Sequence, residues 1–100
     1  MFVRIARFDG GDPSRVDETI DRVRATMDAG ETPPGLEGAR RSVMLVDRQT
    51  GAAMGLTYFD SEDEMRRGDQ ALNAMSPPAD MTGRRTAVEM YEVAIDREWS

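Results

Sequence analysis

The sequence contains no cysteine and no histidine, and all 13 of its basic residues are arginine, so lysine is absent as well. Without these residue types the protein has no imidazole general base, no thiolate nucleophile, and no Schiff-base or phosphate-loop lysine. Structural zinc and histidine-ligated haem or iron are excluded for the same reason. We therefore expect no metal and no cofactor, and any catalysis would have no side-chain base stronger than a carboxylate.

Long apolar runs are also absent. The longest, Val43–Val46, is far shorter than the roughly 20 residues that a membrane-spanning helix requires. The first residues are typical of a strand and lack the apolar core of a signal peptide. The net charge of −6 argues against a nucleic-acid partner, because phosphate binding needs a basic surface. With cysteine missing too, these features predict a cytoplasmic protein without a membrane or nucleic-acid partner.

The chain is long enough for one domain, which we expect to span residues 1–100. A β-type run at Phe2–Phe8 ends in a turn cluster. The next residues predict a helix, with Asp12 as its N-cap, Pro13 at its first position and Gly30 as its C-cap. One stripe of this helix is apolar at helical spacing: Val16, Ile20, Val23 and Met27.

The second half predicts a hairpin, a helix and a last strand. The hairpin strands are expected at about 39–46 and 52–59, with Gly51 in a left-handed conformation at the turn. Ser61 and Glu64 form a capping box for the second helix, which ends before residues 76–78, and the last strand covers 86–95. This order predicts an α+β fold of the ferredoxin-like βαββαβ type, a four-stranded antiparallel sheet with two helices on one face.

The strand sequences favour self-association. Residues 42–46 and 54–59 are largely apolar on both faces, and the apolar residues of 88–95 also fall on both faces, whereas a sheet with one face in water should alternate. Two helices cover only one face, and the simplest cover for the other is a second copy. A homodimer that buries on the order of 800 Å² per partner is the natural size. Trp99, near the end of the chain, could lie over that partner or remain in solvent.

Four segments resemble the antibiotic-biosynthesis-monooxygenase-like family: Gly35–Gly38, Val46–Gly51, Thr57–Glu64 and Val88–Val93. The resemblance covers nearly the whole chain, and its motifs are mostly turns, caps and strand edges. It implies a dimeric α+β barrel built from ferredoxin-like protomers. It also implies two activities, cofactor-independent oxygenation of electron-rich aromatic polyketides and oxygenative haem breakdown.

The chain departs from that family at the positions that the resemblance would make functional. Members tend to use an asparagine on the first strand and a tryptophan near the end of the third, and haem-degrading members add a histidine. Here the only asparagine is Asn73, on the second helix, Phe59 stands where the tryptophan is expected, and histidine is absent. Haem degradation by the usual ligation is therefore not expected, whereas oxygenation stays open.

Arg4 is the most distinctive polar residue of the first strand. Strand alternation places Arg4 with Phe2, Ala6 and Phe8 on one side, and Val3, Ile5 and Arg7 on the other. Arg4 could point into a cavity and stabilise an enolate, carboxylate or phenolate. The alternative, which we favour, is an arginine that pairs with Glu89 or Glu92 of the last strand, because buried charges are usually paired.

Other ligand contacts are predicted from tyrosines and methionines. Tyrosines could hydrogen-bond a ligand at a pocket mouth, and strand methionines could line an adaptable apolar cavity, although ordinary packing explains both types. The candidate ligand-binding residues are Arg4, Met44, Met54, Tyr58, Phe59 and Tyr91. No catalytic residue is assigned.

Three functions fit the sequence. The first is a homodimeric barrel that binds a small apolar or aromatic ligand between the sheet and the helices. The second is a cofactor-independent monooxygenase or isomerase that acts on an activated aromatic or enone substrate. The third is a purely structural dimerisation domain. We favour ligand binding, with catalysis as the alternative.

Overall fold

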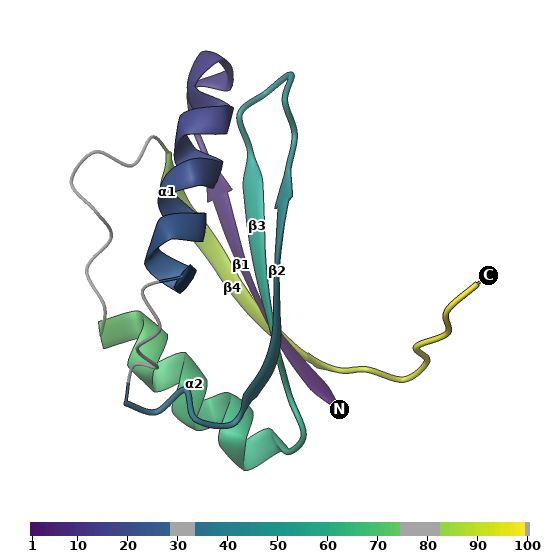
Figure 1. Ribbon diagram of the computed structural model, residues 1–100. Coiled ribbons are helices and arrows are strands. Elements are labelled where there is room, and N and C mark those ends of the chain that lie inside the picture. The colour runs from purple at the N-terminus through teal and green to yellow at the C-terminus, as the bar shows by residue number, and fades with distance from the viewer. Residues whose placement is uncertain (29–33, 75–82, 100) are drawn as a thin grey trace.

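The computed structural model describes residues 1–28, 34–74 and 83–99 (Figure 1). Its elements follow the predicted order. They are β1 (Phe2–Asp9), the 3₁₀ turn η1 (Pro13–Arg15), α1 (Val16–Asp28), β2 (Ala39–Val46), β3 (Ala53–Phe59), α2 (Glu62–Ala74) and β4 (Arg84–Glu92). The helix ends predicted at Gly30 and at residues 76–78 lie outside the described residues.

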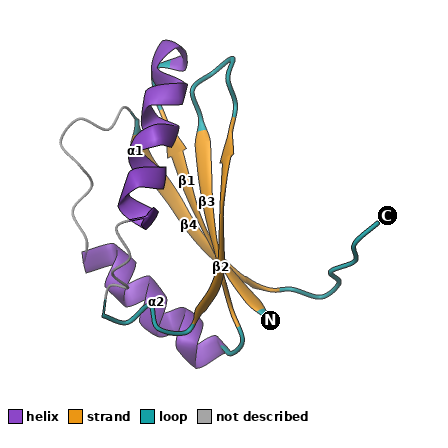
Figure 2. Ribbon diagram, viewed as in Figure 1, coloured by secondary structure: helices purple, strands orange, loops and turns teal. Residues whose placement is uncertain are grey.

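The four strands form one antiparallel sheet in the order β2-β3-β1-β4. Both helices lie on the same side of this sheet (Figure 2). This is the ferredoxin-like arrangement, and the predicted fold class is confirmed. None of the described helices is long and apolar enough to cross a membrane.

Local sequence explains where the helices begin. The Asp12 carboxylate accepts hydrogen bonds from the backbone N–H and the hydroxyl of Ser14, at 2.9 and 2.7 Å. The predicted cap is present, but the first turn that it starts is 3₁₀ rather than α-helical. The Ser61 Oγ accepts from the backbone N–H of Glu64 at 3.1 Å and caps α2 as expected.

The turn between β2 and β3 fixes one end of the molecule. Gly51 has φ +79°, the left-handed conformation that its sequence predicts, and its N–H donates to the Asp47 carbonyl at 2.8 Å. A Cβ at Gly51 would overlap the carbonyl of Gly11, so the turn packs directly against the loop before η1. Arg48 adds an ion pair to Asp17 of α1, with 2.9 Å between nitrogen and oxygen.

The core lies mainly between α2 and the sheet. Phe59 is fully buried, Met65 of α2 is 3% exposed, and Gly68 of α2 sits against the Phe59 ring. The missing side chain at Gly68 allows this close approach of helix and sheet. α1 lies over another part of the same sheet face (Figures 1 and 2).

The opposite face of the sheet carries no helix and is largely apolar. Registered pairs place Val3 beside Tyr58 and Tyr91, and Ile5 beside Leu56. Leu45 is 46% exposed and Tyr91 is 51% exposed there. We call this surface the open face; its residues are Val3, Ile5, Arg7, Arg41, Val43, Leu45, Met54, Leu56, Tyr58, Ala87, Glu89 and Tyr91.

The last strand ends earlier than predicted. β4 stops at Glu92, not at Ile95, and among the described residues one further backbone bond follows, from the Val93 N–H to the Met1 carbonyl at 2.8 Å. The tail then runs away from the sheet (Figure 1), leaving Ile95 87% and Trp99 81% exposed.

Candidate ligand-binding cavity

A cavity of about 490 Å³ separates α1 from the sheet. This volume falls within the range of about 300–1,000 Å³ that is typical of small-molecule sites. Its walls come from β1, the loop before η1, α1, β2, β3 and α2. The lining residues are Phe8, Asp12, Val16, Thr19, Val23, Thr26, Met27, Leu36, Ala39, Ser42, Val43, Met44, Val46, Gly51, Ala53, Met54, Gly55, Leu56, Thr57 and Leu72.

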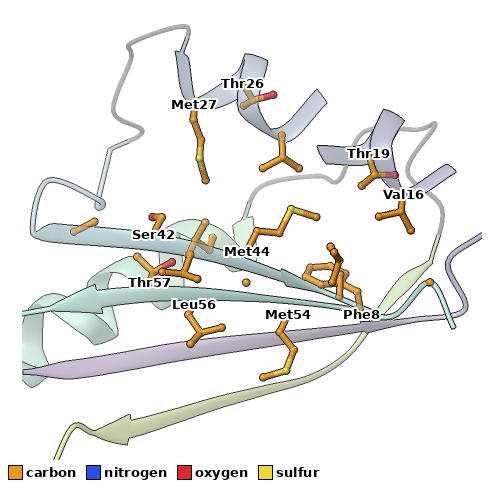
Figure 3. A pocket seen from close by; sticks show the side chains of 18 of the residues that line it. Phe8, Val16, Thr19, Thr26, Met27, Ser42, Met44, Met54, Leu56 and Thr57 are labelled. Atoms are coloured by element: carbon orange, nitrogen blue, oxygen red, sulfur yellow. The ribbon is translucent and has the colours of Figure 1, made fainter. Parts of the chain in front are cut away.

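Strand alternation decides which side chains enter the cavity. Figure 3 shows Val16 and Met27 of α1 pointing toward the sheet, and Met44 and Thr57 pointing back toward α1. The side chains of Met54 and Leu56 point to the other side of the sheet (Figure 3), so these residues line the cavity with their backbone.

Gly55 leaves open space in the middle of β3. Its neighbours in the sheet are Ala6 of β1 and Met44 of β2, both on the helix-facing side. A Cβ built at Gly55 would meet no atom within 4 Å, and its φ is not positive. Neither crowding nor backbone conformation therefore requires glycine at this position. A strand glycine of this kind often marks a place where a ligand approaches the backbone.

The polar groups of the cavity are mostly hydroxyls, from Thr19, Thr26, Ser42 and Thr57. The Thr19 hydroxyl donates to the Arg15 carbonyl at 3.1 Å, and the Thr26 hydroxyl donates to the Arg22 carbonyl at 3.0 Å. Because their protons are used within the helix, these two hydroxyls can offer a ligand only lone pairs.

Among the residues that the structure describes, Asp12 is the one charged residue that lines the cavity. The hydrogen bonds that the Ser14 hydroxyl and backbone N–H donate lower the pKa of the Asp12 carboxyl. Asp12 therefore remains an anion at neutral pH. None of the arginines lines the cavity, and all 13 belong to the described residues.

Arg4 lies under α2 and outside the cavity. It is 4% exposed; its Nε donates to Asp69 Oδ1 at 2.8 Å and its Nη2 to Asn73 Oδ1 at 3.1 Å. The prediction that Arg4 pairs with Glu89 or Glu92 is wrong. Register places Arg4 opposite Met90, so Glu89 faces the other side, and α2 presents both acceptors four residues apart.

Tyr58 and Tyr91 lie on the open face. The Arg41 guanidinium sits 5.8 Å from the centre of the Tyr58 ring. The Tyr91 hydroxyl donates to Glu89, which also accepts from Arg7. The hydrogen bond from Arg7, followed by that from Tyr91, lowers the pKa of Glu89, and the same bond from Tyr91 raises the pKa of the tyrosine.

The six residues proposed from sequence thus occupy three different places. Met44 and Met54 line the cavity, Arg4 and Phe59 lie beneath α2, and the two tyrosines are on the open face. Sequence reasoning missed Gly55 and the α1 threonines. The available signal for Gly55 was an isolated glycine inside an apolar strand. The role of the threonines in the lining could not be predicted from sequence, because it depends on where α1 lies over the sheet.

Comparisons with known proteins identify the fold. No family model matches the sequence, and none of the curated proteins compared with it is similar. Among solved structures, one similar protein is MhuD of Mycobacterium tuberculosis, a haem degrader with two haems bound in its active site. MhuD is 16% identical to this chain, with a TM-score of 0.69, and the match covers 98% of this chain and 100% of MhuD.

Two further structures agree. A putative antibiotic biosynthesis monooxygenase from Deinococcus radiodurans is 12% identical, with a TM-score of 0.61 and coverage of 100% and 99% of the two chains. SnoaB, a cofactor-independent oxygenase from Streptomyces nogalater, is 16% identical, with a TM-score of 0.53 and coverage of 95% and 94%. This chain has the fold of the antibiotic biosynthesis monooxygenases. The resemblance seen in the sequence is confirmed for the fold.

Proposed function

We propose that this protein is a cytoplasmic, antibiotic-biosynthesis-monooxygenase-like homodimer that binds a small apolar or aromatic molecule in the cavity beneath α1. The observation that carries the proposal is the cavity itself. It combines a ligand-sized volume with walls of aliphatic, aromatic and thioether side chains and a few hydroxyls. Solved proteins of the same fold include one with haems bound in its active site.

Binding is favoured over catalysis because the described lining offers little reactive chemistry. An oxygenase or isomerase of an enone would need a group that stabilises developing negative charge. The candidates for that role, Arg4 and the two tyrosines, do not line the cavity, and the Arg4 guanidinium is already bonded to Asp69 and Asn73. The hydroxyls that do line it suit recognition rather than proton transfer.

The open face supports the homodimer. Its centre is apolar, and Leu45 and Tyr91 are about half exposed in the single protomer. A second sheet on this face would cover them and would form the barrel that the sequence resemblance implies. The cavity lies on the opposite side of the sheet, so dimerisation leaves it available to a ligand.

Native mass spectrometry of freshly purified protein tests both parts of the proposal. We expect a dimer, and retained extra mass would identify the ligand class. Leu45→Glu should shift the protein to monomer, because it places a charge in the buried interface. Gln49→Glu is the matched control: it adds the same charge in the exposed hairpin turn and should leave the dimer intact. A wild-type monomer would refute the homodimer.

A further inference from the structure

We infer that the cavity selects an uncharged ligand over an anionic one, and that Gly55 holds open the space which this ligand occupies. The inference rests on the proposed ligand-binding function and narrows its chemistry. Three features of the molecule carry it: the absence of cations around the cavity, the Asp12 carboxylate before α1, and the free volume above Gly55.

The first feature is the distribution of cations. An anion buried in an apolar site needs a cationic partner or several N–H donors to offset its lost hydration. No arginine lines the cavity, and the chain has no lysine or histidine. Residues 29–33, 75–82 and 100 contain no basic residue either, so the rest of the chain has no cation to add.

The second feature is the start of α1, where a helix would otherwise attract an anion. Asp12 is the N-cap of η1, the 3₁₀ turn that leads into α1, and it lines the cavity as an anion. Asp17 and Glu18 in the first turn of α1 add no net charge to the cavity, because neither lines it and each is paired with arginine: Asp17 with Arg48, and Glu18 with Arg15 and Arg22. The Asp12 carboxylate therefore disfavours a bound anion at this end of the cavity.

The third feature is Gly55. The space above it belongs to the cavity between the sheet and α1, and a Cβ built at Gly55 would meet no atom within 4 Å. A flat molecule could therefore rest against the backbone of β3 at this point. A large side chain at Gly55 would extend from this open Cβ position into the cavity and compete with the ligand for the same space.

A porphyrin does not suit a cavity that lacks cations. Their propionates need cationic or N–H partners, and the iron needs an axial ligand such as imidazole, thiolate or phenolate. The described lining offers no cationic side chain and none of these ligands. Its Met27 and Met44 thioethers resemble the methionine ligand of cytochromes c, but there methionine ligates the iron together with a histidine, which this chain lacks. The haem sites of MhuD thus do not carry over to this chain, although the fold is shared.

A matched pair of fluorescent probes tests the inference. N-phenylnaphthylamine is uncharged, and anilinonaphthalenesulfonate has the same ring system with an added sulfonate. In fluorescence titrations of the full chain, we expect the uncharged probe to bind at least about tenfold more tightly. Gly55→Leu should abolish its binding while the circular dichroism spectrum is unchanged.

A charge variant provides a second readout that does not depend on Gly55. Ser42 lines the cavity from an exposed position on edge strand β2, so Ser42→Lys should fold and should raise the affinity for the sulfonate probe relative to the neutral one. Gln49→Lys adds the same charge outside the cavity and should leave the ratio unchanged.

The outcomes separate this inference from the proposed function. If the sulfonate probe binds as tightly as the neutral probe, and Gly55→Leu abolishes both, the cavity binds ligands but the selectivity is wrong. If neither probe binds, or if both bind Gly55→Leu as they bind the wild type, the cavity is not a ligand site and both proposals fail. A preference for the neutral probe that Gly55→Leu removes supports both.

Discussion

Replacing Arg4 by methionine tests how the buried ion pair holds α2 against the sheet. Arg4→Met keeps most of the apolar stem of the side chain but removes its charge and its hydrogen bonds. Asp69 would lose the guanidinium that now lies 2.8 Å from its Oδ1. Asn73 would keep its bond from Arg85 Nη1, at 2.7 Å, so it would not be left unpaired.

The expected cost follows from the exposure of the two partners. Removing one member of a fully buried pair costs about 3–5 kcal/mol, because the other charge stays buried alone. Arg4 is 4% exposed but Asp69 is 19% exposed, so water can partly solvate the remaining carboxylate. We therefore expect Arg4→Met to lower the free energy of unfolding by about 2–3 kcal/mol. The thermal midpoint should fall by about 10 °C or more.

Urea and thermal denaturation, followed by circular dichroism at one fixed protein concentration, measure this cost, because the stability of an oligomer depends on concentration. Arg40→Met is the matched control. Arg40 pairs with Asp60 at 2.7 Å, but these side chains are 58% and 51% exposed, so its loss should cost less than about 1 kcal/mol. The double variant Arg4→Met/Asp69→Leu should recover much of the loss, since it leaves no unpaired charge.

Two results would refute this reasoning. One is an Arg4→Met protein that unfolds within about 0.5 kcal/mol of the wild type, which is the usual effect of a surface substitution. The other is a double variant as unstable as the sum of its single changes, because the two charges would then not be coupled.

Further predictions concern two glycines and a carboxylate. Gly55→Ala should raise the free energy of unfolding by about 0.5–1 kcal/mol, since its Cβ meets no atom. Gly68→Ala should lower the free energy of unfolding by about 1–3 kcal/mol, because its Cβ would overlap the Phe59 ring. If thermal denaturation shows the same change in stability for both variants, the packing described around these two glycines is wrong. The pKa of Glu89 is lowered from 4.5 in the folded state, so its stabilising interaction is present above that pH and is lost as the pH falls through the folded value. Glu89→Gln should therefore differ from wild type in stability near neutral pH and converge with it in acid, and a constant difference across the pH titration would argue otherwise.

Most of the fold could be predicted from local patterns. Asp12, Ser61 and Gly51 each act within a few residues of chain, and their predicted roles in caps and turn are confirmed. The two-residue alternation of β1 is also a local property. It correctly placed Arg4 and Arg7 on opposite faces of the sheet. Arg4 forms its ion pair with Asp69 on the helix-facing side, and Arg7 forms its ion pair with Glu89 on the open face.

The site was less predictable because it depends on the distance between layers. Sequence shows that α1 has an apolar stripe, but not that α1 stands far enough from β2 and β3 to leave a cavity. The partner of Arg4 was missed because it comes from a helix rather than from a neighbouring strand. The strand β4 was predicted too long because apolar residues continue to Ile95, and an apolar pattern does not show where a strand stops pairing with its neighbour.

The strand order has a consequence for how the domain folds during synthesis. β1 lies in the middle of the sheet, yet its two neighbours are β3 and β4, which the ribosome makes later. Val3 acquires its second strand partner only when Tyr91 has been synthesised. The central strand β1 therefore cannot pair on both sides until nearly the whole domain has been synthesised. Pairings between segments so far apart in the sequence slow folding. Until then its apolar residues are exposed to chaperones and to other nascent chains.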